Sequence, residues 1–155
     1  MRVIVTGGAG FIGTAVIRYL LENTRHSVIN LDKLTYASVK ESAKKLSREE
    51  RYLFVKADVC DSSVLRGVFE THRPDVVLHL AAETHVDASI ENPRSFLDTN
   101  VFGTYSLLEV TRDYWSGLTG DKSRRFRFLH VSTDEVFGDL ELREEPALED
   151  HVYVP

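Results

Sequence analysis

Short apolar runs alternate along this chain with longer segments in which apolar residues recur every three or four positions. Runs rich in β-branched residues predict strands at residues 2–6, 27–32, 52–58, 75–82 and 126–133. Helix-like spacing occupies residues 11–23, 39–46, 61–72 and 93–115. Strands that are apolar on both faces and joined by helices are typical of a parallel sheet covered on both sides. The pattern therefore predicts a doubly wound α/β fold.

Polar and helix-breaking residues indicate where the elements begin and end. Asp61 suits the N-cap of the third helix, and Asn92 followed by Pro93 suits the start of the fourth. Residues 116–125, SGLTGDKSRR, are expected to form a flexible loop. After Asp139 the chain becomes acidic and irregular, LELREEPALEDHVYVP.

The composition limits the classes of partner and the cellular locations that can be expected for this protein. The 155 residues are 43% hydrophobic and 28% charged, which suits one globular domain. A formal net charge of −5 argues against nucleic acid or an anionic membrane as the partner. The single Cys60 excludes an internal disulfide, and no apolar run approaches the ~20 residues that span a bilayer. The start, MRVIVTGG, leaves no room for a signal peptide, so we expect a cytoplasmic protein; no cluster of Cys, His and Asp indicates a metal site.

The stretch VTGGAGFIG follows the first predicted strand and opens the first helix. Gly7, Gly10 and Gly13 fit the pattern Gly-x-x-Gly-x-x-Gly, which permits a tight turn and close approach of the backbone to a pyrophosphate. The helix N-terminus adds free N–H groups and the positive end of the helix dipole. A plain tight turn is the alternative, but the strand before and the helix after favour a dinucleotide site.

Asp32, at the end of the second strand, favours NAD over NADP. A carboxylate there accepts hydrogen bonds from the adenosine ribose hydroxyls and repels a 2′-phosphate. The neighbouring Lys33 weakens this preference, because its charge could meet a phosphate. Asp58 ends the third strand and is similarly placed for the adenine amino group. The alternatives are a capping role for Asp32 and a solvated turn for Asp58.

Six motifs together carry a family resemblance. VTGGAGFIG, NLDKLTYA, ADVCD, HLAAETHVD, DTNVFGTYSLLE and STDEVFGD resemble the extended short-chain dehydrogenases/reductases, and most closely the dTDP-glucose 4,6-dehydratases. The likeness runs from Met1 to about Asp139. It implies that residues 1–139 are a partial NAD-binding Rossmann domain, and that residues 140–155 begin the catalytic and substrate-binding part.

The resemblance implies a lyase of deoxysugar biosynthesis with a dTDP-glucose-like nucleotide sugar as substrate. In that reaction NAD takes hydride from C4 of the glucosyl unit, water leaves across C5–C6, and hydride returns to C6. By resemblance Glu135 is the base at C5, Asp134 is the acid at the C6 hydroxyl, and Thr133 hydrogen-bonds the C4 oxygen. Adjacent carboxylates in unequal environments can divide acid and base roles. A polar strand end with solvated acids is the alternative.

The resemblance also implies cofactor contacts along the chain. They fall on Gly7, Gly10, Phe11, Ile12, Gly13, Asp32, Lys33, Leu34, Thr35, Asp58, Val59, Leu80, Ala81, Ala82, Thr84 and Thr99. Thr84 and Thr133 fall on substrate-contacting positions. Asn100 resembles the residue that stabilises the helix near the site, and Ala88 and Phe137 stand where Arg and Tyr are frequent.

The superfamily uses a Tyr-x-x-x-Lys pair to remove the C4 hydroxyl proton. The match at Tyr36–Lys40 follows the second strand, at the adenosine end of the cofactor, so we reject it as catalytic. The resemblance places the genuine pair on a helix after the fifth strand, which covers one sheet face and contributes to a homodimer interface. We therefore expect the chain alone to lack turnover and to expose apolar surface.

Two other functions stay open at this point. A nucleotide-sugar epimerase or decarboxylase of the same superfamily would make Asp134 dispensable. A non-catalytic NAD-binding module would bind NAD without turnover. His79 and His130 lie inside apolar strands, and we expect both to be buried core residues rather than ligands.

Overall fold

The computed structural model describes residues 1–35, 38, 46, 48–138 and 146–154. Five parallel strands lie in the order β3-β2-β1-β4-β5: β1 (Arg2–Thr6), β2 (Ser27–Asp32), β3 (Tyr52–Lys56), β4 (Val76–His79) and β5 (Arg127–His130). The predicted doubly wound sheet is confirmed. Since β1 pairs with both β2 and β4, the strand order reverses beside β1, where such sheets bind their ligands.

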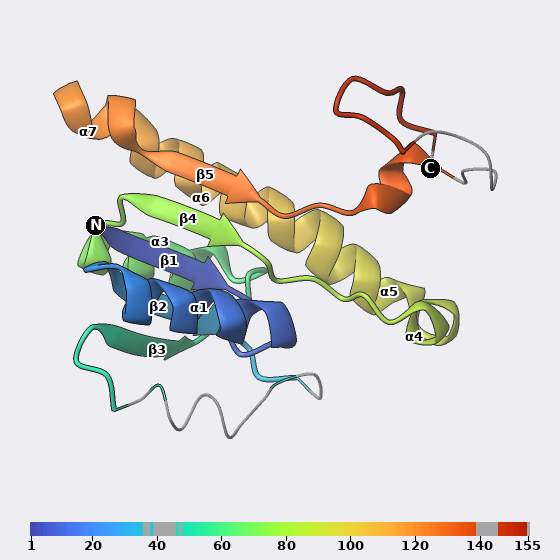
Figure 1. Ribbon diagram of the computed structural model, residues 1–155, viewed down its shortest axis with the longest axis horizontal. Helices are drawn as coiled ribbons and strands as arrows, with labels where there is room; N and C mark the ends of the chain where they lie inside the picture. Colours follow the sequence, from blue (N-terminus) through green and yellow to red (C-terminus); the bar gives the residue numbers. More distant parts are fainter. Residues whose placement is uncertain (36–37, 39–45, 47, 139–145, 155) are drawn as a thin grey trace.

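Helices cover both faces of the sheet (Figure 1). Helix α1 (Phe11–Asn23) lies on one face, and α3 (Ser62–His72) and α6 (Thr104–Ser116) lie on the other. Shorter elements complete the described chain: α4 (Val86–Glu91), α5 (Pro93–Phe96), the π-helical turn η1 (Leu97–Gly103), α7 (Gly120–Arg125) and the 3₁₀ turn η2 (Asp134–Phe137). The predicted helix at 39–46 and the match at Tyr36–Lys40 fall almost entirely outside the described residues. None of the described helices is long and apolar enough to cross a membrane.

Several of the predicted element ends agree with the structure, but the single helix predicted at 93–115 is wrong, because this segment is divided into α5, η1 and α6. The Asp61 carboxylate caps α3, because Oδ1 accepts the backbone N–H groups of Ser63 and Val64 at 3.1 Å. Pro93 occupies the first turn of α5. The flexible loop predicted at 116–125 is wrong in its second half, where α7 forms. This helix carries Asp121 in its first turn and basic residues in its last, which suits the helix dipole.

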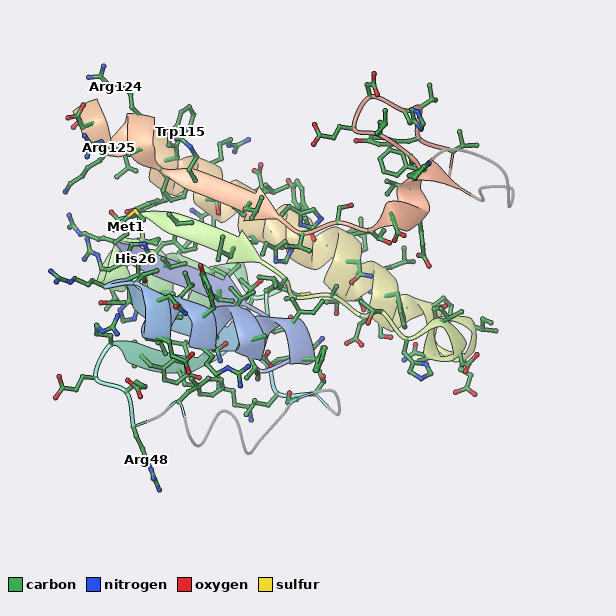
Figure 2. All side chains as sticks on the ribbon, in the orientation of Figure 1. Met1, His26, Arg48, Trp115, Arg124 and Arg125 are labelled. Atoms are coloured by element: carbon green, nitrogen blue, oxygen red, sulfur yellow. The ribbon has the colours of Figure 1, made fainter. Side chains whose placement is uncertain are left out.

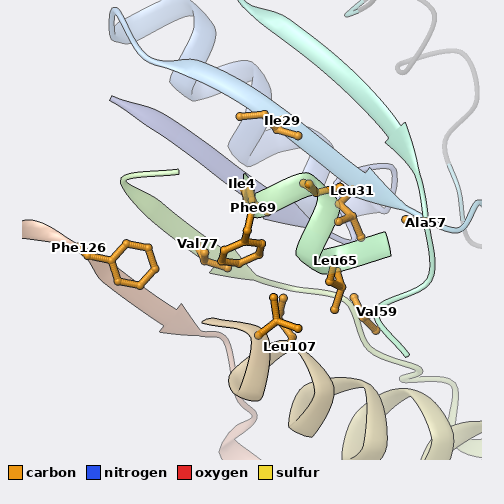
Figure 3. Close-up of a cluster of buried hydrophobic side chains, with 12 residues drawn as sticks. Ile4, Ile29, Leu31, Ala57, Val59, Leu65, Phe69, Val77, Leu107 and Phe126 are labelled. Atoms are coloured by element: carbon orange, nitrogen blue, oxygen red, sulfur yellow. The ribbon is translucent and has the colours of Figure 1, made fainter. Parts of the chain in front are cut away.

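Alternate residues of β1 pack into two separate cores. Val3 and Val5 pack with Ile17 and Leu21 of α1. Ile4 points to the other face, into a larger cluster formed with Ile29, Leu31, Ala57, Val59, Leu65, Val68, Phe69, Val77, Leu107, Val110 and Phe126 (Figure 3). These cores hold the strands in register, so that the loops at their carboxyl ends meet along one edge of the sheet.

Strand β5 lies at the edge of the sheet and leaves apolar side chains in the open. Leu129 is 54% and Val131 is 46% exposed, which is the apolar surface that the sequence predicted. The prediction of a core position for His130 is wrong. Its side chain is exposed because, among the described strands, β5 has a neighbour on one side only, so no strand beyond β5 contributes side chains that would cover it. His79, its partner in the register of β4, is fully buried as predicted.

Candidate functional site

The glycine loop between β1 and α1 has no room for side chains. Gly7 adopts φ +68°, and a Cβ there would lie 2.7 Å from the backbone N and Cα of Ala81. A Cβ on Gly13 would overlap the carbonyl oxygen of Gly7. Gly8, which the Gly-x-x-Gly-x-x-Gly pattern does not include, is equally confined, because its Cβ would overlap the Asn30 side chain. The loop therefore presents bare backbone at its surface.

The N-terminus of α1 opens at this loop. Gly10 is the N-cap residue, and no described side chain accepts a hydrogen bond from the first N–H groups of the helix. Phe11 is 85% and Ile12 is 60% exposed. A helix of thirteen residues with free N–H groups at an open end suits an anionic group such as a phosphate.

The Asp32 carboxylate joins β2 to the glycine loop. Its Oδ2 accepts the backbone N–H of Ala9 at 2.9 Å, and its Oδ1 accepts that of Leu34 at 2.7 Å. The capping role that the sequence left as the alternative is therefore present. Because a carboxylate oxygen accepts more than one hydrogen bond, both oxygens can still accept from a ribose hydroxyl.

Lys33 turns its ammonium group toward three other segments of the same edge. Its Nζ donates to Thr99 Oγ1 at 3.0 Å and lies 3.5 Å from Glu83 Oε1 and 3.7 Å from Asp58 Oδ2. Asp58 also accepts the backbone N–H of Cys60 at 3.0 Å. Four of the predicted cofactor residues, Asp32, Lys33, Asp58 and Thr99, thus lie at one edge of the sheet, and the adjacent Val59 is buried in the core.

The loop after β4 is held from two sides. The backbone N–H groups of Leu80 and Ala81 both donate to Thr6 Oγ1 at 3.2 Å. The Asn100 amide accepts the N–H of Glu83 at 2.8 Å and donates to its carbonyl oxygen at 2.9 Å. Ala82 and Thr84 remain exposed in this loop. Thr99 and Asn100 both belong to η1, and π-helical turns are frequent at functional sites.

Beneath this loop, His79 is buried in a neutral form. Thr6 Oγ1 already accepts two N–H groups, so its O–H donates to His79 Nδ1 at 2.7 Å. His79 Nε2 then carries the proton and donates to Thr104 Oγ1 at 3.0 Å. Burial, with a smaller contribution from the nearby His130, lowers the pKa of His79 to about 4. His79 is a satisfied core residue.

The residues after β5 form a capped turn. Thr133 Oγ1 accepts the backbone N–H of Glu135 at 3.2 Å, which starts η2. Asp134 and Glu135 occupy its first turn, and both side chains are exposed. They line a hollow of about 370 Å³ together with Phe137, Gly138, Pro146 and Ala147. The sequence did not predict this turn, because its cap depends on one hydroxyl and not on a periodic pattern.

A second hollow, of about 290 Å³, lies between the segment after β2 and helices α4 and α5. It is lined by Thr35, Glu83, Ala88, Glu91, Asn92, Ser95 and Phe96. Among the described residues, no group of three or more His, Cys, Asp and Glu side chains is arranged to hold a metal ion.

Comparison with known proteins places this geometry in a family context. The family model described as GDP-mannose 4,6 dehydratase matches residues 4–155. The dTDP-glucose 4,6-dehydratase 1 of Escherichia coli (strain K12) is 56% identical over 140 residues, which are 90% of this chain and 39% of that protein.

Solved structures share the same fold. The dTDP-glucose 4,6-dehydratase of Streptomyces venezuelae, crystallised with NAD bound, superimposes with a TM-score of 0.85 at 37% identity, covering 100% of this chain and 46% of that one. The UDP-glucose 4-epimerase of Thermotoga maritima, crystallised with UDP-glucose, gives a TM-score of 0.80 at 33% identity, with 100% and 45% covered. The chain spans less than half the length of each of these proteins.

Proposed function

Because the chain belongs to the GDP-mannose 4,6 dehydratase family, we propose that it forms the cofactor-binding part of an NAD-dependent dehydratase of nucleotide-activated glucose. The observation that carries the proposal is the joint geometry of the glycine loop, the open N-terminus of α1 and the Asp32 carboxylate at the switch point of the sheet. Bare backbone, free N–H groups and an acceptor for ribose hydroxyls are the three features that a dinucleotide site needs.

Different residues of this edge would bind different parts of NAD. When bound, NAD would accept the hydride and later return it. The glycine loop and the N-terminus of α1 would hold the pyrophosphate, and Asp32 would hold the adenosine ribose. Asp58 and Val59 would contact the adenine, and Leu80, Ala81, Ala82, Thr84 and Thr99 would contact the rest of the cofactor. The confined Gly7 and Gly13 would let the pyrophosphate approach the backbone closely.

The capped turn after β5 supplies the acid and the base. Glu135 removes the C5 proton, Asp134 protonates the departing C6 oxygen, and Thr133 donates a hydrogen bond to the C4 oxygen. Support comes from the Thr133 cap, which starts the turn that carries Asp134 and Glu135, and from the hollow of about 370 Å³ that both residues line. We take dTDP-glucose as the substrate, in line with the 56% identical relative, and a cytoplasmic homodimer as the form of the complete protein.

An epimerase acting on a nucleotide sugar is the second candidate. It is favoured by the TM-score of 0.80 with the Thermotoga maritima epimerase. The two candidates differ in the need for Asp134, because an epimerase does not expel water and has no departing hydroxyl to protonate.

Calorimetric titration of the chain with NAD and with NADP tests the cofactor assignment, after circular dichroism has established that the chain is folded. We expect NAD to bind more tightly than NADP. A folded chain that binds neither dinucleotide would contradict the proposal.

A further inference from the structure

Lys33 has an environment that a phosphate-binding lysine would not need. Its ammonium group donates to Thr99 Oγ1 at 3.0 Å and lies within 3.7 Å of two carboxylates, those of Glu83 and Asp58. Thr99 is 3% exposed, and the Glu83 side chain is 14% exposed, whereas that of Lys33 is 33% exposed. The lysine therefore points inward, and its charge is balanced by two negative groups of the same chain.

The three partners of Lys33 come from three different segments. Asp58 follows β3, Glu83 follows β4, and Thr99 lies in η1, while Lys33 itself follows β2. One side chain thus joins the segments that follow β2, β3 and β4 to η1. Glu83 is held twice, since Asn100 of η1 binds its backbone and Lys33 binds its carboxylate.

We propose that Lys33 is a positioning residue that fastens these loops together. We also propose that Glu83 keeps the positive charge of Lys33 away from a phosphate on the adenosine ribose. The inference rests on the proposed NAD function and adds a determinant of specificity to it. Lys33 then leaves the preference for NAD intact, in contrast to the expectation from sequence that its charge weakens this preference. Asp32 repels the 2′-phosphate, and Glu83 withholds the Lys33 ammonium group that could attract it.

The fastening role is tested without any ligand. Thermal unfolding is measured for the wild type, Lys33→Met, Glu83→Gln and the double variant, with Lys122→Met of α7 as the matched control. We expect Lys33→Met to lower Tm by about 3 °C. When Lys33→Met is already present, adding Glu83→Gln should change Tm little further, because Glu83 has already lost its Lys33 partner. Additive shifts, or an equal loss in Lys122→Met, would overturn the fastening role.

The specificity role is tested by titration of the same variants with NAD and NADP. Glu83→Gln frees Lys33 from one counter-charge, and we expect the affinity for NADP relative to NAD to rise about threefold. Adding Lys33→Met should abolish that gain. An unchanged ratio in Glu83→Gln, or a gain that persists without the lysine, would overturn the inference. A folded wild type that binds neither dinucleotide would instead refute the proposed function, and the unfolding cycle would still decide the fastening role.

Discussion

The Asp32 carboxylate accepts the backbone N–H of Ala9 at 2.9 Å, so the residue proposed to bind the adenosine ribose also anchors the glycine loop. The same group accepts the N–H of Leu34 at 2.7 Å. Binding and architecture therefore depend on one side chain. A ligand that bridges Asp32 and the loop meets two groups that are already held in position, which reduces the entropy lost on binding.

We expect Asp32→Asn to lower the affinity for NAD by about tenfold and to reduce the discrimination against NADP. The amide lacks the negative charge that repels a 2′-phosphate, and its NH₂ group faces an N–H that the carboxylate accepted. Titration calorimetry with both dinucleotides measures the two effects.

Asp121→Asn is the matched control for this substitution. Asp121 lies in α7, at the amino ends of the strands. Figure 2 shows Arg124 and Arg125 of the same helix toward the same end of the molecule as Met1 and His26, away from the carboxyl edge. Asp121→Asn should leave the affinities for NAD and for NADP unchanged. An Asp32→Asn variant that rejects NADP as strongly as the wild type would show that Asp32 does not select the cofactor.

Two glycines allow the confinement of the loop to be tested by substitution. Gly7→Ala places a Cβ 2.7 Å from the backbone of Ala81, at a φ of +68° that alanine disfavours. We expect a loss of about 3 kcal/mol in the free energy of unfolding, measured by urea titration, and no detectable NAD binding.

Gly67→Ala is the control, because Gly67 lies within α3 and its added Cβ meets nothing within 4 Å. There the same change should stabilise the chain by about 0.5–1 kcal/mol through helix propensity. Equal effects at the two positions would mean that the glycine loop is not confined as described.

The parts of the fold that depend on local pattern were predicted from the sequence. The ends of β1, β2 and α1 agree with the predicted ranges, because buried β-branched runs and a glycine turn determine them locally. Strands β3, β4 and β5 end earlier than predicted. Leu80 and Val131 continue the apolar runs, but their backbone lies in the loops beyond the last pairing of β4 with β5. An apolar pattern reports burial and does not report where a strand stops pairing.

The candidate site was predicted only as far as its motifs extend. The spacing of the glycines and of Asp32 follows from the chemistry of a dinucleotide. The partners of Lys33 do not, since Thr99 lies 66 positions away along the chain and meets it only because η1 crosses the sheet edge. The exposed position of His130 was missed for a similar reason: an apolar strand at the edge of a sheet has the same sequence pattern as one in its centre.

Acid should destabilise the chain through His79. The pKa of this residue is about 4 in the folded protein, because burial disfavours the charged ring, against 6.5 for an ordinary histidine. Below pH 6.5 the unfolded chain therefore binds a proton that the folded chain does not. Stability attributable to His79 is present above pH 6.5 and is lost as the pH falls toward 4, by roughly 3 kcal/mol.

Urea unfolding at a series of pH values measures the slope of the free energy of unfolding against pH. His79→Gln should flatten it between pH 6.5 and 4, although the variant is less stable throughout. His151→Gln, at an exposed position, should leave the slope unchanged. A wild-type slope that survives His79→Gln would assign the acid sensitivity to other groups.

The acid and base roles are testable in a chimera in which this chain replaces the matching segment of a full-length dehydratase. Asp134→Asn and Glu135→Gln should each lower the formation of the 4-keto-6-deoxy sugar by about 10²–10⁴-fold, which is the usual contribution of a general acid or base. Oxidation at C4 should persist, because neither carboxylate takes part in it. The absorbance of reduced nicotinamide reports oxidation, and chromatography of the product reports elimination.

Glu70→Gln, on the exposed surface of α3, is the control and should keep full turnover. Loss of oxidation and elimination together would indicate that η2 had lost its shape, which a circular dichroism spectrum and the retained affinity for NAD would reveal. Normal elimination by Asp134→Asn would refute the acid role and favour the epimerase. The Thr133 cap starts the turn that carries both residues. If only elimination is lost, the turn has kept its shape, and the loss is due to the missing acid or base.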